Sequence, residues 1–320
     1  MSGQAILVAG KTGQLARCLA DAARRRGIGL VTLGRPELDL THPESVARIV
    51  ASHAPRAIVN AAAYTAVDKA EAEPTLAMAV NRDGAGALAA AAARLGVPFI
   101  HVSTDYVFDG RKDAPYREED APCPLGAYGR SKLEGEAAVR GACPAGVILR
   151  TSWVYSPFGQ NFVTTMLRLA ATREKVEVVD DQHGAPTAAP DLASAILDIA
   201  EQLSAQRMDD GDTGGIYHLA AAGETTWYGF VGAIFAGWAR RGHRVPMLEP
   251  ITTAQYPTPA RRPANSRLDC SKITRVFGLC LPAWQGSLER CLDELALVSR
   301  FRSSPEFAAR SGANFGIEGH

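Results

Sequence analysis

The sequence predicts an α/β protein built on a doubly wound parallel sheet, with a smaller α/β region in its C-terminal half. Three observations lead to this prediction: strand-length apolar segments alternate with helical patterns, a glycine-rich turn follows the first of them, and the chain has 320 residues. Strands that alternate with helices are joined by right-handed crossovers and lie parallel in one sheet. A chain of this length has room for one large domain and an additional region.

The first apolar segment, 5–9, runs into a glycine turn, and helical spacing then extends from Gln14 to Arg25. Small residues in such a turn let the backbone approach a pyrophosphate, which binds the free N–H groups at a helix N-terminus. Its position after a first strand predicts a dinucleotide site. The predicted contacts are Gly10, Lys11, Thr12, Gly13, Gln14 and Leu15. An NTPase P-loop is excluded, because that motif needs a glycine where Ala5 stands.

Segment 29–33 predicts the second strand, and Gly34 and Arg35 follow it. In a nicotinamide dinucleotide site, the residues after this strand meet the adenosine ribose. An acidic side chain there binds the ribose 2′-hydroxyl, whereas an arginine pairs with a 2′-phosphate. Arg35 therefore favours NADPH, with a solvated loop arginine as the alternative interpretation. Asp39 and Leu40 come next and are expected beside the adenine.

Two further strands, 57–60 and 98–102, are separated by helical patterning over 74–95. Ligands of such sheets bind where parallel strands end, so the residues after each strand are candidate contacts. The expected cofactor contacts are the small and polar residues Ala61, Ala62, Ala63, Tyr64, Thr65 and Ser103. Thr104 carries a hydroxyl that can donate to a substrate carbonyl oxygen.

Tyr128 and Lys132 stand four residues apart, which places both side chains on one face of a helix. A phenol has an ordinary pKa of about 10, and a nearby fixed cation stabilises its phenolate. Taken alone, the pair favours an ordinary helix, with Tyr128 as a half-buried aromatic and Lys132 as a solvated neighbour. With Thr104 after the fourth strand and the glycine turn before it, the constellation indicates a proton donor acting beside a nicotinamide.

Longer stretches resemble the dTDP-4-dehydrorhamnose reductases, a family of the extended short-chain dehydrogenase/reductase superfamily, over roughly residues 3–296. They are NAAAYTAVDKAE at 60–71, STDYVF at 103–108, RTSWVY at 150–155, DQHGAPT at 181–187 and YPTPARRP at 256–263, with the glycine turn, 226–227 and 265–268. The resemblance implies a Rossmann-type fold and reduction of the 4-keto group of dTDP-4-dehydro-L-rhamnose to dTDP-L-rhamnose, with NADPH or NADH as the hydride source.

The resemblance also implies roles for single residues. Tyr128 protonates the developing alkoxide, Lys132 lowers the pKa of Tyr128 and holds the ribose, and Thr104 polarises the ketone. Tyr128 and Lys132 thereby also contact the cofactor. Trp153, after the strand over 146–149, forms a flat wall against the sugar, with a core tryptophan as the alternative. The expected substrate contacts are Thr104, Asp105, Tyr106, Trp153, Asn265 and Arg267.

Arg267 belongs to the stretch 241–267, which is rich in proline and arginine and has little periodicity. Arginine forks match the oxygens of a nucleotide diphosphate, although solvated loop arginines are the alternative.

Three departures from the family limit what the resemblance implies. Gly34 and Arg35 replace the frequent acidic residue after the second strand, which leaves NADH preference in doubt. Cys18 and Pro190 stand where some members carry magnesium-binding glutamates at a dimer interface. No metal site is therefore predicted, and binding of Mg2+ is doubtful. A homodimer remains a possible assembly, without these glutamates to support it. The tail over 298–320 extends past the usual end of the family and is expected to be loose.

The composition of the chain argues against several classes of binding partner. Lys plus Arg equals Asp plus Glu at 34 each, so no overall basic field indicates nucleic acid. The six cysteines contain no Cys-x-x-Cys pair, which argues against a zinc cluster. No apolar segment approaches the length of about 18 residues that a membrane helix needs. We therefore expect a cytoplasmic protein that acts on a small sugar nucleotide and binds neither nucleic acid nor membrane.

The expected organisation is an NAD(P)-binding Rossmann domain over 1–155, a region over 156–297 that binds the sugar nucleotide and returns some strands to the main sheet, and the tail. Two other functions stay open at this point. One is a sugar-nucleotide epimerase or dehydratase that holds NAD tightly. The other is a non-catalytic, cofactor-binding regulatory subunit, against which the complete set Thr104, Tyr128 and Lys132 argues.

Overall fold

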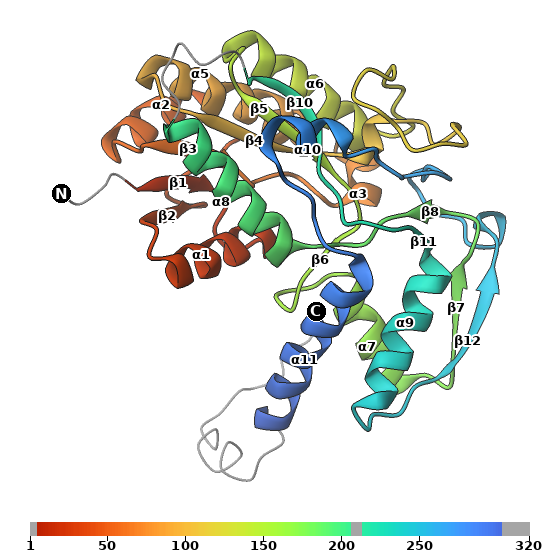
Figure 1. Cartoon of the computed structure of the whole chain (residues 1–320). Coiled ribbons are helices and arrows are strands. Elements are labelled where there is room, and N and C mark those ends of the chain that lie inside the picture. The colour runs from red at the N-terminus through yellow and green to blue at the C-terminus, as the bar shows by residue number, and fades with distance from the viewer. Residues whose placement is uncertain (1–4, 206–212, 303–320) are drawn as a thin grey trace.

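A six-stranded parallel sheet organises the protein (Figure 1). The structure is a computed structural model that describes residues 5–205 and 213–302. The strand order is β10-β5-β4-β3-β1-β2, and each neighbouring pair is parallel. The strands are β1 (Ile6–Ala9), β2 (Leu30–Leu33), β3 (Ala57–Asn60), β4 (Phe99–Thr104), β5 (Val147–Thr151) and β10 (Gly215–His218). The predicted doubly wound parallel sheet is confirmed.

Helices cover both faces of this sheet (Figure 1). One layer contains α1 (Gln14–Arg26) and α8 (Ala189–Ala205), and the other contains α2 (Pro43–Ser52), α5 (Ala85–Leu95) and α6 (Ala127–Ala142). Successive residues of β1 alternate between the two cores: Ile6 and Val8 pack with the first layer, Leu7 and Ala9 with the second. Burial on both faces explains why the strands are continuous apolar runs.

The chain leaves β1 toward β2 on one side and later returns to β3 on the other, so β1 and β3 flank the switch point of the sheet. A crevice opens at the carboxyl ends of the strands at such a point. The glycine turn follows β1 and the small residues from Ala61 follow β3, so both predicted cofactor segments meet there.

The helical pattern over 74–95 is not one regular helix. It comprises α4 (Pro74–Met78), a π-helical turn η1 (Ala79–Gly84) and α5. The buried Asn81 of this turn exchanges hydrogen bonds with the backbone of Tyr64, at 2.8 and 3.1 Å, and donates to Ser131 Oγ at 2.9 Å. These partners are distant in sequence, so helical periodicity gives no sign of the irregular turn.

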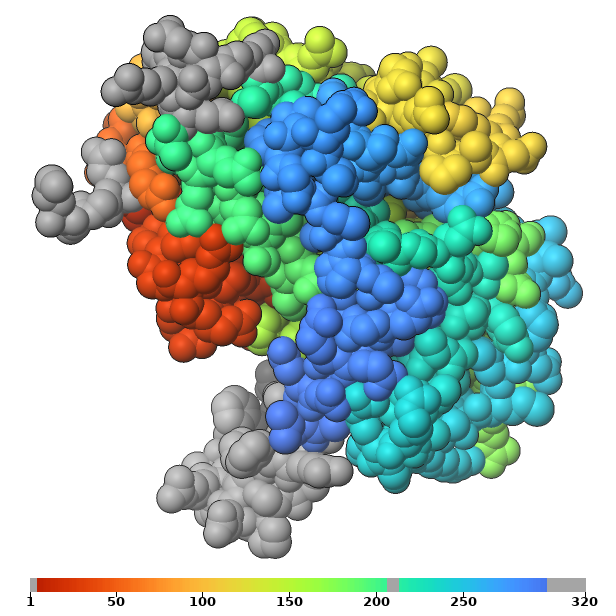
Figure 2. Space-filling view, in the orientation of Figure 1, coloured from red at the N-terminus to blue at the C-terminus, as the bar shows by residue number. Residues whose placement is uncertain are grey.

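The second region has its own apolar core between α7 (Phe162–Thr172), α9 (Trp227–Arg240), α11 (Trp284–Arg302) and the two-stranded sheet of β7 (Lys175–Val179) and β12 (Met247–Ile251). Figure 2 shows α11, in blue, lying against α9, in cyan. The predicted bounds of α7 and β7 are confirmed. Strand β12 lies in the stretch without periodicity and was not predicted, because its pairing with β7 supplies its order.

Short elements complete the described residues: α3 (Val67–Ala72), the 3-10 turns η2 (Asp105–Val107) and η3 (Thr253–Gln255), α10 (Ser271–Phe277), β6 (Val154–Tyr155), β8 (His183–Gly184), β9 (Thr187–Ala188) and β11 (Thr225–Thr226). Helix α11 continues to Arg302, and the rest of the expected tail, 303–320, lies outside the described residues. None of the helices in the described part of the chain is long and apolar enough to cross a membrane.

Candidate active site

A cavity of about 780 Å3 lies at the carboxyl ends of the sheet strands, at the switch point. It is lined by the predicted cofactor contacts and by four of the six predicted substrate contacts. These are Gly10, Lys11, Thr12, Gly13, Gln14, Leu15, Arg35, Asp39, Leu40, Ala61, Ala62, Ala63, Tyr64, Thr65, Ser103, Tyr128, Lys132, Thr104, Asp105, Tyr106 and Trp153. The fold therefore brings together residues that are far apart in the sequence.

The glycine turn forms the cradle at one end of this cavity. Gly10 has φ +118°, and a Cβ there would lie 3.3 Å from Ala61 C and Ala62 N, so only glycine fits without displacing the backbone after β3. Gly13 caps α1 without any side-chain hydrogen bond, and the first turn of α1 contains no acidic residue. The first N–H groups of this helix are therefore available to an anion, which fits the pyrophosphate of a dinucleotide.

Two exposed cations stand at the corner after β2. Arg35 lines the cavity, and Lys11 Nζ forms an ion pair with Glu37 at 2.8 Å. A Cβ on Gly34 would lie 2.9 Å from Lys11 Cβ, so a larger side chain at this position would displace Lys11. Asp39 accepts hydrogen bonds from the backbone N–H and the hydroxyl of Thr41, which hold its pKa below the ordinary range. The corner thus combines a firmly ionised Asp39 with two cations.

Tyr128 occupies the first turn of α6, with its ring edge-on to Tyr106 at 5.7 Å. Burial raises the pKa of Tyr128 to about 12; interaction with the Thr104 hydroxyl opposes this, and the charge of Asp105 adds to it. The phenol consequently keeps its proton at neutral pH, as a proton donor must.

Lys132 is fully buried one turn further along α6. Its Nζ donates a hydrogen bond to the Val102 carbonyl at 2.7 Å and lies 3.3 Å from His101 Nε2. Burial lowers the pKa of Lys132 to about 8, against the opposing charge of Glu136. The cation expected to act on Tyr128 therefore interacts with β4 on its other side, and burial makes its charged form less stable.

Thr104, the last residue of β4, and Asp105, the first residue of η2, form a hydrogen-bonded pair. Thr104 Oγ1 accepts from the Tyr106 N–H at 3.2 Å and donates to Asp105 Oδ1 at 3.1 Å. Burial raises the pKa of Asp105 to about 6, opposed by interaction with the hydroxyls of Ser266 and Thr104. Asp105 Oδ2 has no hydrogen-bond partner among the residues that the structure describes. A buried carboxylate oxygen at the cavity wall is available to accept a hydrogen bond from a ligand hydroxyl.

Trp153 forms an aromatic wall together with a residue that was not predicted. Its indole stacks on Trp227, which also lines the cavity, with ring centres 3.6 Å apart and planes 11° apart. Trp153 has φ +49°, unusual for a bulky residue, and a Cβ on Gly184 would lie 2.5 Å from its ring. Trp227 begins α9, which Thr226 caps by accepting from the Gly229 N–H at 3.0 Å. The sequence offers only the Thr226-Trp227 pair as a signal.

A buried ion pair supports the wall behind Ser103. Arg150 donates from Nε and Nη2 to Glu136 at 2.9 and 2.7 Å, and Ser103 Oγ donates to the same carboxylate at 2.5 Å. Arg150 and Glu136 are almost fully buried, and they join β5 to α6. This pair fixes the helix that carries Tyr128 against the strand beside β4.

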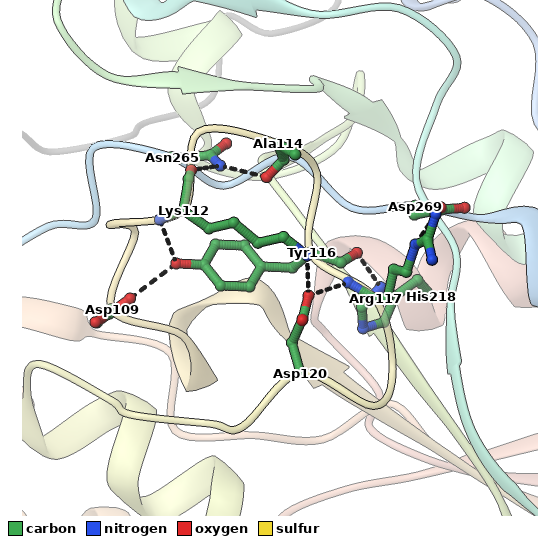
Figure 3. A network of polar contacts seen from close by, with 9 residues as sticks. All are labelled: Asp109, Lys112, Ala114, Tyr116, Arg117, Asp120, His218, Asn265 and Asp269. Carbon is green, nitrogen blue, oxygen red and sulfur yellow. Dashed lines mark hydrogen bonds and ion pairs between the residues drawn. The ribbon is translucent and has the colours of Figure 1, made fainter.

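Asn265 and Arg267 were predicted to contact the substrate, but they are not among the residues that line the cavity. Figure 3 shows the Asn265 amide donating to the carbonyls of Lys112 and Ala114, at 2.5 and 3.0 Å. Its Oδ1 accepts from Arg267 Nε at 2.8 Å, and Arg267 pairs with Glu224 at 3.0 Å. Both side chains are thus engaged in holding the loop that follows β4, because the backbone carbonyls of that loop need donors. Ser266, between them, is the residue that reaches Asp105.

Cys18 is buried in α1, and Pro190 lies in the first turn of α8. Within residues 5–205 and 213–302, no group of three His, Cys, Asp or Glu side chains is placed to hold a metal ion.

Three comparisons place this site among known proteins. A family model described as the RmlD substrate binding domain matches residues 4–297. A curated dTDP-4-dehydrorhamnose reductase from Sinorhizobium fredii is 52% identical over 295 residues, covering 92% of this chain and 99% of that protein. A crystal structure of a dTDP-4-dehydrorhamnose reductase from Clostridium acetobutylicum has a TM-score of 0.84 at 35% identity, covering 91% of this chain and 99% of that chain.

A second crystal structure, of dTDP-4-dehydrorhamnose reductase from Bacillus anthracis, was solved in complex with NADP. It has a TM-score of 0.83 at 33% identity and covers 91% of this chain and 99% of that chain. The resemblance found from the sequence motifs is therefore confirmed over nearly the whole chain. The chain belongs to the dTDP-4-dehydrorhamnose reductase family.

Proposed function

We propose that the chain is an NAD(P)H-dependent reductase that converts dTDP-4-dehydro-L-rhamnose to dTDP-L-rhamnose. The observation that carries this proposal is the half-buried, protonated phenol of Tyr128 next to Thr104, in a cavity whose other end is the glycine cradle. The curated relatives that match nearly the whole chain bear this name. Residues 1–155 would mainly bind the cofactor and 156–297 mainly the sugar nucleotide, with a homodimer as a possible assembly.

The side chains around the ketone have distinct tasks in this reaction. A bound nicotinamide supplies the hydride. Tyr128 gives its proton to the 4-oxygen as negative charge develops there, and the phenolate that remains is stabilised by Lys132. The only hydroxyl proton of Thr104 is directed at Asp105 in the structure, so Thr104 polarises the ketone by turning this donor to the substrate. Asp105 then accepts from a sugar hydroxyl instead.

The aromatic wall suits the apolar face of a 6-deoxy sugar. Trp153 and Trp227 present stacked rings to the cavity, and Phe162 packs against Trp227 from behind, with ring centres 4.3 Å apart. Rings held in this way offer a rigid surface that excludes water from the reacting carbon.

An activity assay tests the proposed function. We expect dTDP-4-dehydro-L-rhamnose to cause oxidation of NADPH, followed by its absorbance, with dTDP-L-rhamnose as the product. Absence of turnover in protein that still binds NADPH would contradict the proposal. Stoichiometric NAD in the purified protein would favour the epimerase or dehydratase, and cofactor binding without any turnover would favour the regulatory subunit.

The cofactor preference is expected to depend on Arg35. Replacing Arg35 by Asp removes the arginine fork that would pair with a 2′-phosphate and supplies a carboxylate for the 2′-hydroxyl of NADH. We expect the ratio of kcat/KM with NADPH to that with NADH to fall at least about tenfold, since a charge-assisted hydrogen bond contributes about 1.5–3 kcal/mol. Paired steady-state rates with the two cofactors measure this ratio. Arg56→Asp, on the loop before β3, is the matched control, and an unchanged ratio in Arg35→Asp would remove Arg35 from this role.

A further inference from the structure

Behind Lys132 lies a buried polar relay that the proposed reaction does not itself use. Asn60 ends β3, His101 is its register partner on β4, and Lys132 comes from α6. Asn60 Nδ2 is 3.0 Å from His101 Nδ1, and His101 Nε2 is 3.3 Å from Lys132 Nζ. All three side chains are buried, at 1% exposure or less. Each donor and acceptor of these side chains must therefore be satisfied by protein groups rather than by solvent.

The orientation of Asn60 is fixed by the backbone. The N–H of Ala62 donates to Asn60 Oδ1 at 3.1 Å, so the amide oxygen faces Ala62 and the NH2 group faces the imidazole. An amide NH2 group only donates, and therefore His101 Nδ1 must accept. Burial and the nearby Lys132 hold the pKa of His101 well below its ordinary range, so the ring is neutral and carries one proton. That proton resides on Nε2.

The Nε2–H group of His101 then points at the nitrogen of Lys132. An ammonium has no lone pair and would face this donor with another donor, whereas a neutral amine accepts the hydrogen bond. The Val102 carbonyl accepts from Lys132 Nζ in either state. The contact with His101 therefore favours the neutral amine.

Other charged groups around Lys132 do not reverse this preference. Glu136, one turn along α6, favours the ammonium, but its carboxylate is already bound by Arg150 of β5 and Ser103 of β4. Helical turn η1 packs against α6 and carries Arg82, which forms ion pairs with Asp83 and Glu134 at the surface of the protein. Tyr128 is neutral while it keeps its proton, and the charge of Asp105, in η2, raises the pKa of Tyr128.

We propose that Asn60 and His101 form a positioning relay for Lys132, in which Asn60 fixes the tautomer of His101 and His101 presents its N–H to the lysine amine. This inference rests on the proposed reductase function, in which the ammonium form of Lys132 stabilises the phenolate left by proton transfer. By favouring the amine, the relay sets the upper pH limit of the reaction. Activity is then lost at a lower pH than an isolated lysine would allow, since the ordinary pKa of lysine is about 10.4.

The tautomer can be measured without any turnover. In 15N-histidine-labelled protein, two-bond nitrogen–proton correlation spectra distinguish a protonated Nε2 from a protonated Nδ1, and the His101 signals are those lost in His101→Asn. We expect His101 to be neutral with its proton on Nε2. A proton on Nδ1 would overturn the proposal, whatever the outcome of the activity assay.

Asn60→Asp tests the consequence for catalysis. A carboxylate only accepts, so it draws the proton of His101 to Nδ1, leaves Nε2 as an acceptor for the ammonium, and should move the basic limb of the kcat profile up by about one pH unit. Asn81→Asp is the matched control: it adds a carboxylate at another buried asparagine facing α6, with no contact to His101, and should leave the limb in place. The proposal is overturned if Asn60→Asp leaves the tautomer or the limb unchanged, or if both variants shift the limb equally.

Discussion

Replacing Tyr128 by Phe is expected to lower kcat about 10²- to 10⁴-fold, the usual contribution of a positioned general acid. The variant removes only the phenolic oxygen, so the ring keeps its edge-on contact with Tyr106. Binding of NADPH, measured by fluorescence titration, should change little because the glycine cradle is untouched. Steady-state rates with saturating sugar nucleotide measure the loss.

Tyr155→Phe provides the control for Tyr128→Phe. Tyr155 is fully buried, and its hydroxyl makes a long contact, 3.4 Å, to the Trp284 carbonyl in the core of the second region. It is expected to retain kcat. If Tyr128→Phe kept more than half of the original kcat, another group would have to supply the proton and the proposed mechanism would be wrong.

Arg150→Met is expected to lower the free energy of unfolding by about 3–5 kcal/mol, because it leaves the Glu136 carboxylate buried without its ion-pair partner. Chemical denaturation in urea measures this change. The double variant Arg150→Met with Glu136→Leu removes both charges and is expected to recover most of the stability, since apolar residues often replace a buried ion pair without loss. Equal stability of Arg150→Met and the unmodified protein would show that Glu136 finds other partners.

Local patterns in the sequence were sufficient for the elements that form the sheet and its cradle. The apolar segment before Gly10 and the spacing after it predict β1 and α1, because strand burial and helix amphipathicity repeat over a few residues. The same is true of α7, whose predicted bounds match the structure and whose first turn is closed by a capping box between Asn161 and Thr164.

Features that depend on distant partners were not predictable in this way. Strand β12 forms because it pairs with β7. The irregular turn η1 is held by the hydrogen bonds of Asn81 with Tyr64 and Ser131. At the site, the sequence indicated which residues follow the strands but not that Trp227 would stack on Trp153. It also placed Asn265 in the substrate site, whereas the structure uses that side chain to bind loop carbonyls.

The position of β10 has a consequence for how the protein can be made. β10 completes the sheet beside β5, yet it is synthesised only after the whole of α7, β7 and α8. Until then the apolar β5 is an open edge, which invites pairing with other chains. A fragment that ends at residue 155 would retain this open edge permanently. The sheet that carries the cofactor site is therefore complete only when residues well beyond the predicted boundary at 155 have been added.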